Sequence, residues 1–372
     1  MMKRTWRAYR IKMTTVGPVY IGSGREFSKK EYVFLSKDKV GILDTVKLYQ
    51  LMKARGLQKQ FEEYLLREGR LDLSQWIRQY QISTKELLPC IRYTLDCGDT
   101  VLQRGTKTSI MENIKDSYGM PFIPGSTIKG MLRTILLSAS LFQEEQKAGG
   151  WKRSIREAAQ RSAGRNIYLA REIRQLEVEA FHQTVREGTR KSDAVNDEMA
   201  GMIVSDSMPI PLSQIILCQR IEYHVDRGEK LLNVLRECIR PETEIAFTLT
   251  IDETKCQWTV EDIKEALGIF NDCYNVCFLS AYPNFDRLQK NHLFLGGGVG
   301  FVSKTVVYPL FGKKEGIEMT QKIFEHTKVP KNHKHYLDGR MGVSPHILKC
   351  TKYKGQVLQM GLCKLMDIQE LG

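Results

Sequence analysis

The sequence predicts an α+β protein, in which strands and helices pack in layers. Residues 8–16 and 243–251 alternate apolar and polar side chains, the pattern of strands with one covered face. Residues 128–139 carry apolar side chains three and four positions apart, which form one buried face of a helix. At 372 residues the chain exceeds a single ordinary core, so we expect two domains or one domain with large insertions.

The first strand, at 8–16, has a basic open face, and such a face is usually a solvated surface. A turn follows that contains Gly22, Ser23 and Gly24, with the cation Arg25 beside them. Small residues at this position let a backbone or a ligand come near. The turn is therefore a candidate contact site.

Two short apolar runs between residues 32 and 43 predict a β-hairpin. Asp44 then precedes apolar residues at helical spacing, which favours a helix cap at this position. Residues 46–90 are predicted to be helical. The basic, glycine-punctuated segment 104–108 could project as a hairpin arm.

The central stretch, residues 119–137, predicts the start of a long helix. Prolines at 121 and 124 hold the chain extended, and Gly125 permits a tight turn. Ser126 or Thr127 can cap the first amides, so the helix should begin near residue 127.

The first turn of this helix breaks two local rules. Lys129 lies at the positive end of the helix dipole, at a cost of about 0.3 to 1 kcal/mol. Gly130 costs about 1 kcal/mol relative to alanine. A phosphate at the helix start, in reach of Lys129 and Arg133, would reverse both penalties. The alternative is an ordinary capped core helix with a solvated lysine.

Residues 138–195 are predicted to be a second helical, arginine-rich insertion. A strand is expected at 202–212, and we place the domain boundary after it. The second half should contain a strand at 215–221, a helix capped by Thr259, and a last strand at 356–365.

A glycine-rich loop constrains function in the second half. Gly296, Gly297, Gly298 and Gly300 cannot form a regular strand, and they fit where the main chain approaches something closely. Phe301 breaks both the P-loop and the dinucleotide spacing. Contact with a polymer backbone and a purely structural turn both remain open.

The chain is basic, with 56 Lys and Arg against 43 Asp and Glu, a net charge of +13 and a sequence pI near 9.2. This balance favours a polyanionic partner, either nucleic acid or an acidic membrane surface. Neither a signal peptide nor an apolar run of membrane-spanning length is present in the sequence, so we expect a cytoplasmic protein without a membrane partner.

Metal and cofactor sites are not expected. The nine cysteines are scattered and odd in number, so we expect reduced, mostly buried thiols. Cys273 and Cys277 have helical spacing but lack a second pair to complete a zinc site. The pair His333 and His335 lacks metal-binding partners that the sequence identifies, which favours an ordinary loop pair.

Three motifs together resemble a known family. Residues 121–133 (PFIPGSTIKGMLR), 19–24 (VYIGSG) and 296–305 (GGGVGFVSKT) are similar to motifs of the RAMP superfamily. More narrowly, the chain resembles the Csm subunits that cap the guide-RNA filament of type III-A CRISPR effector complexes. The resemblance runs through the chain in motif order, although the helical insertions match only in kind.

The resemblance implies two ferredoxin-like, RRM-related domains, which we place at residues 1–212 and 213–372. It implies binding of guide RNA (crRNA) near its 3′ end, contact with target RNA, with neighbouring RAMP backbone subunits and with small helical subunits, and a role in guide maturation with host trimming nucleases. The RNA-binding candidates from the glycine turns, the helix start and nearby cations are Gly22, Ser23, Gly24, Arg25, Gly125, Ser126, Thr127, Lys129, Arg133, Gly296, Gly297, Gly298, Gly300 and Lys304.

No catalytic residue is predicted. Backbone subunits of such complexes cut RNA with a loop aspartate, but the sequence around Asp44 departs from theirs and favours a cap. His182, His224 and His292 lack a partner visible in the sequence. The alternatives are a RAMP endoribonuclease that processes the precursor guide itself and, less favoured, a nucleotide-dependent enzyme built on residues 296–300.

Overall fold

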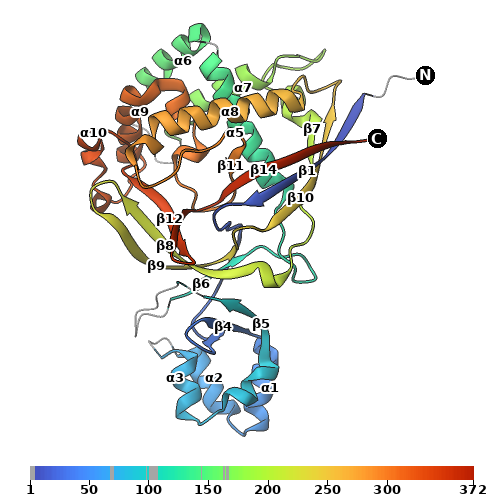
Figure 1. Cartoon of the computed structure of the whole chain (residues 1–372), viewed down its shortest axis with the longest axis vertical. Coiled ribbons are helices and arrows are strands. Elements are labelled where there is room, and N and C mark those ends of the chain that lie inside the picture. Colours follow the sequence, from blue (N-terminus) through green and yellow to red (C-terminus); the bar gives the residue numbers. More distant parts are fainter. Residues whose placement is uncertain are drawn as a thin grey trace.

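The computed structural model describes residues 5–67, 71–97, 99, 108–143, 145–161, 164 and 167–372. The predicted mixed α+β class is confirmed, with two β-sheets, a group of helices on the larger body and a separate helical lobe (Figure 1). None of the described helices is both long and apolar enough to span a bilayer.

The first sheet is antiparallel and brings together strands from distant parts of the chain. Ile11 and Met13 of β1 point into the core, as their alternation predicts. The strand order is β11 (His292–Phe294), β14 (Leu362–Leu371), β1 (Trp6–Thr15), β10 (Glu244–Asp252) and β7 (Met202–Val204).

The second sheet is larger and contains the strands that follow β1 in the sequence. The predicted hairpin is confirmed in β3 and β4, and the strand expected at 215–221 is confirmed in β8. The order is β2 (Gly22–Phe27), β6 (Ile110–Asn113), β9 (Gly228–Ile239), β8 (Ile215–His224), β5 (Ile91–Asp96), β4 (Lys39–Leu43) and β3 (Tyr32–Phe34), with β12 (Ile347–Tyr353) paired to β8 and β13 (Gln356–Gln359) paired to β12.

A group of helices covers the core at the top of Figure 1. The predicted apolar face of α5 is buried at Ile128, Leu132, Ile135 and Leu136, and α5 packs against α8 and α9. Thr259 caps α8, as predicted. The group comprises α5 (Gly125–Gln143), α6 (Glu145–Ala158), α7 (Ala170–Phe181), α8 (Val260–Cys277), α9 (Val307–His326) and the short α10 (Asp338–Met341).

A helical lobe lies apart at the bottom of Figure 1 and has its own core, which includes Leu48, Phe61 and Trp76. Asp44 caps the first of these helices by accepting the N–H groups of Val46 and Lys47, at 3.0 and 3.1 Å, so the predicted cap is confirmed. The lobe contains α1 (Thr45–Ala54), α2 (Gln58–Leu66), α3 (Leu73–Gln79), α4 (Thr84–Leu87) and the 3-10 turn Leu88–Cys90.

Three predicted extents are corrected. The strand expected at 202–212 ends at Val204, since prolines at 209 and 211 cannot donate to a ladder. The strand expected at 356–365 is two strands in different sheets, β13 and β14, separated at Gly361 with φ of +74°. The helical insertion expected at 138–195 is helical only as far as Phe181, apart from short turns.

Other predictions have mixed outcomes. All nine cysteines are buried and unbridged, as expected. Each sheet contains strands from both sides of residue 212, and the division at this residue stays a prediction. The arm predicted at 104–108 lies outside the described residues, except for Thr108.

Candidate nucleic-acid interface

The first and third glycine motifs lie against each other. The N–H of Gly297 donates to the carbonyl oxygen of Tyr20, at 2.7 Å. Gly296 has φ of +80°, and a Cβ built on it would lie 2.2 Å from the same carbonyl oxygen. The close approach expected of this loop is therefore an approach to the chain's own backbone, just before Gly22.

An arginine that the sequence analysis missed lies over this loop. A Cβ on Gly298 would lie 2.2 Å from Nη1 of Arg236, whose guanidinium also stacks 5.0 Å above the ring of Tyr20. Nη1 is buried and has no hydrogen-bond partner, and within the described residues no carboxylate forms an ion pair with Arg236. An unpaired guanidinium of this kind is suited to a phosphate or to a base edge.

Two more cations join Arg236 on the second sheet. Arg220 on β8 and Lys349 on β12 both contact Glu222, at 2.8 and 2.7 Å, across neighbouring strands. Burial lowers the pKa of Lys349, and the positive charges of Arg220 and Arg236 lower it further. Three cations therefore share one carboxylate, so this cation cluster (Arg220, Arg236 and Lys349) carries a net positive charge.

The helix start in the second motif is satisfied from within the molecule. Helix α5 begins at Gly125, two residues earlier than predicted, and the carboxylate of Asp206 accepts the N–H of Gly125 at 2.8 Å. The carbonyl of Pro124 accepts the N–H groups of Thr127 and Ile128. The expected cap by Ser126 or Thr127 is wrong, because Asp206 reaches the helix start from the segment after β7.

The cations of this motif are also held by the chain. Arg133 forms ion pairs with Asp197 at 2.8 Å and Glu177 at 3.1 Å, and its guanidinium lies 4.3 Å above the ring of Phe181. Lys129 is half-buried, and burial lowers its pKa. Bound RNA would compete with two carboxylates for Arg133, and contact of either residue with RNA stays a prediction.

An apolar cavity of about 280 Å³ connects the second and third motifs. Its lining includes Arg133 from α5 and Phe301, Lys304 and Thr305 from the glycine-rich loop. Lys304 is exposed at the edge of this loop. The loop therefore lies between the first motif on one side and α5 on the other, and the fold brings all three motifs to one region.

The remaining candidates lie on β2. Ser23 donates to Glu112 at 3.3 Å and accepts the N–H of Arg25 at 3.1 Å. Gly24, with φ of +84°, and Arg25 are exposed. Arg220, Arg236 and Lys349 were missed because their strand positions carry no local signal, since each becomes notable only when β8, β9 and β12 pair.

The model of the RAMP superfamily matches residues 12–303. The chain belongs to the RAMP superfamily. The match begins in β1 and ends within the glycine-rich loop, so it includes the three motifs up to Ser303. The family resemblance inferred from the sequence is confirmed.

Curated relatives narrow the similarity. The chain is 26% identical over 384 residues to the protein called Csm5 of a CRISPR system in Mycobacterium tuberculosis, covering 96% of this chain and 97% of the relative. It is 27% identical to the Csm5 protein of Streptococcus thermophilus, covering 85% and 84%. A similar match is found to Csm5 of Enterococcus italicus, at 25% identity.

Two solved structures share the fold. One is a chain in a cryo-EM structure of a type III-A Csm–crRNA–target RNA ternary complex, with a TM-score of 0.62 and 17% identity over 96% of this chain and all of that chain. The other is the crystal structure of Csm5 from T. onnurineus, with a TM-score of 0.50 and 17% identity over 95% of this chain. This RAMP protein therefore resembles Csm5 subunits of type III-A CRISPR systems in sequence and in fold.

Proposed function

We propose that this RAMP protein is a non-catalytic, RNA-binding subunit of a cytoplasmic type III-A CRISPR ribonucleoprotein. It caps the filament at the 3′ side of the guide RNA and is needed for guide maturation. Its surfaces contact guide RNA, target RNA, neighbouring RAMP backbone subunits and small helical subunits, while trimming is done by host nucleases. In this proposal residues 1–212 and 213–372 are two ferredoxin-like units.

One observation carries the proposal: the motifs converge on the glycine-rich loop beside the cation cluster. Arg236 has no carboxylate partner among the described residues, although it is partly buried over Gly298. A buried, unpaired cation costs free energy that an anionic strand would recover. The similarity to Csm5 proteins along almost the whole chain supports a guide-RNA strand as that anion.

The proposal assigns affinity to phosphate contacts rather than to base reading. The candidates on β2, the start of α5 and the glycine-rich loop offer cations and small residues. Such contacts act across sequences, and each lost contact to single-stranded RNA lowers the salt slope by about 0.7.

The test is co-purification and binding. Tagged protein should bring down a ladder of short RNAs together with related subunits, and the purified protein should bind guide-length RNA with a steep salt dependence. The double variant Arg220→Ala/Arg236→Ala should weaken binding uniformly across RNA sequences. Arg7→Ala on β1, whose guanidinium pairs with Glu253, is the matched control. Equal binding by all three proteins would contradict the proposed interface.

The non-catalytic assignment has its own test. Protein alone is incubated with labelled repeat RNA in the presence of a chelator, and we expect uncut RNA. A discrete product that disappears in Asp44→Ala or in a single histidine variant would instead establish the endoribonuclease alternative.

A further inference from the structure

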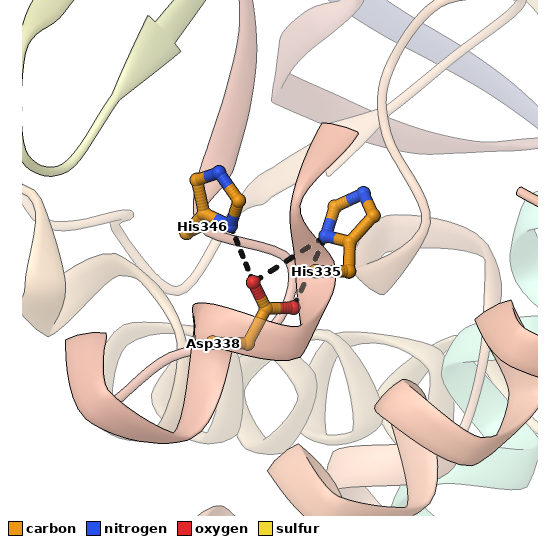
Figure 2. Close-up of side chains that lie close together, drawn as sticks. All are labelled: His335, Asp338 and His346. Carbon is orange, nitrogen blue, oxygen red and sulfur yellow. Dashed lines mark hydrogen bonds and ion pairs between the residues drawn. The ribbon is translucent and has the colours of Figure 1, made fainter. Parts of the chain in front are cut away.

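A loop between α9 and β12 gathers two histidines around one buried aspartate. Asp338 is fully buried and His346 is 1% exposed, while 11% of the His335 side chain is exposed (Figure 2). The carboxylate of Asp338 lies between the two imidazole rings, and Nδ1 of each ring faces it (Figure 2). The sequence did not identify these two partners for His335.

The distances fit one metal ion. Two donor atoms on one tetrahedral Zn²⁺, each about 2.0 Å from the ion, lie about 3.3 Å apart. Nδ1 of His335 is 3.1 and 3.4 Å from the two oxygens of Asp338, and Nδ1 of His346 contacts one of those oxygens. The three donor atoms all lie within 4.8 Å of one another.

We propose that His335, Asp338 and His346 form a binding site for a divalent transition-metal ion, with Zn²⁺ as the ion that the donor set fits. Two imidazole nitrogens and one carboxylate oxygen form a known ligand set for such ions and disfavour Mg²⁺ and Ca²⁺, which prefer oxygen ligands. Each neutral imidazole keeps its proton on Nε2 when Nδ1 binds the ion. The proposal is independent of RNA binding.

The surroundings hold these ligands in place. Ser344 donates its hydroxyl to Asp338 at 2.5 Å, which leaves the other carboxylate oxygen to face the histidines. Helix α9 fixes the loop at both ends: Gln321 donates to the carbonyl of His335 at 2.9 Å, and Tyr308 donates to the carbonyl of Ser344 at 2.6 Å. Such outer contacts orient metal ligands and contribute to affinity.

A fourth position is open to water. A cavity of about 190 Å³ is lined by His335 and His333 together with Gly300 and Lys349. Its volume is ample for a water molecule, which commonly completes a three-ligand zinc site. Bound zinc would thus fix the loop beside Lys349, at the edge of the cation cluster.

The experiment uses the full chain, freed of any affinity tag and of metal. Zn²⁺ is titrated against a competing chelator, and bound metal is counted by atomic emission. We expect one Zn²⁺ per chain, a raised melting temperature in its presence, and a visible Co²⁺ spectrum typical of a tetrahedral site without thiolate charge-transfer bands. Absence of binding by the wild-type chain would overturn the site.

Variants locate the ion. His335→Ala, at the most exposed ligand, should weaken Zn²⁺ binding by about 100-fold or more, and Ser344→Ala by about 10-fold, the range found for outer contacts. His326→Gln, a histidine of α9 bonded to its own helix, is the matched control and should bind as the wild type does. Unchanged affinity in folded His335→Ala, or loss only in Cys277→Ser, would show that the site is elsewhere.

Discussion

Arg133 and Arg236 are both partly buried arginines beside a glycine motif, but their surroundings differ. Arg133 on α5 is paired with Asp197 and Glu177, and the neighbouring helix start is closed by Asp206. Arg236 on β9 stacks on Tyr20 with Nη1 unpaired. The two motifs look alike in sequence as anion sites, yet only the second leaves a cation unneutralised, so local sequence rules alone do not identify an RNA contact.

The largest expected effect breaks the closed helix start. In Gly125→Ala the new Cβ would lie 2.2 Å from the carbonyl oxygen of Val204, so β7 or the helix must move. We expect a loss of about 3 kcal/mol in the free energy of unfolding. Denaturant unfolding measures it, and a variant as stable as the wild type would contradict the close packing of α5 on β7.

The second effect compares the two arginines directly. Arg236→Ala should weaken binding of guide-length RNA about 10-fold at low salt, or about 1.4 kcal/mol, whereas Arg133→Ala should weaken it less, since its guanidinium already has two partners. Fluorescence anisotropy over a salt series measures both variants. A larger loss in Arg133→Ala would reverse the comparison and place the RNA at α5.

The third effect concerns Gly130, in the first turn of α5. A Cβ at this position meets nothing within 4 Å, so Gly130→Ala should raise the free energy of unfolding by about 1 kcal/mol. Thermal unfolding checks the gain, with Gly125→Ala as the contrasting change in the same helix. A gain in stability together with a clear loss of RNA affinity would show that RNA approaches this turn after all.

The smallest effect lies in the helical lobe, away from both motifs. Hydrogen bonds from Ser83, and then from Arg55, lower the pKa of Glu86 from 4.5 to about 2. Because the folded-state pKa is lowered, this contribution to stability is present above pH 4.5 and is lost as the pH falls towards 2.

Glu86→Gln should therefore flatten the pH dependence of the melting temperature over that acidic range while changing RNA binding little. Scanning calorimetry at a series of pH values measures the difference. Glu63→Gln on α2, in the same lobe, is the control for removing a carboxylate there. An unchanged pH profile in Glu86→Gln would show that the capping contacts of Glu86 contribute little.

Sequence patterns predicted the parts of the fold that depend on near neighbours. The apolar face of α5, the alternation in β1 and the caps at Asp44 and Thr259 are set by residues within a few positions of one another. The predictions failed where a distant residue decides the structure. Asp206 caps α5 from 81 positions away, and Gly361 divides the last predicted strand because β14 pairs with β1.

The candidate interface shows the same division. Glycine positions were predicted because glycine carries a local conformational signal, and Gly296 and Gly298 do adopt positive φ. The cations that accompany them were not, since Arg236 meets Gly298 only through the fold. The ligand partners of His335 were missed for a related reason: an aspartate and a histidine in a loop have no periodicity to mark them.

The pairing of β1 with β10 and β14 has a consequence for biosynthesis. β1 ends at Thr15, but β10 begins at Glu244 and β14 at Leu362, so the first strand emerges from the ribosome long before either neighbour exists. Non-local pairing of this kind is slow and leaves an exposed strand edge in the meantime. The nascent chain must therefore keep β1 from pairing wrongly until translation has nearly finished, which makes this strand a natural client for chaperones.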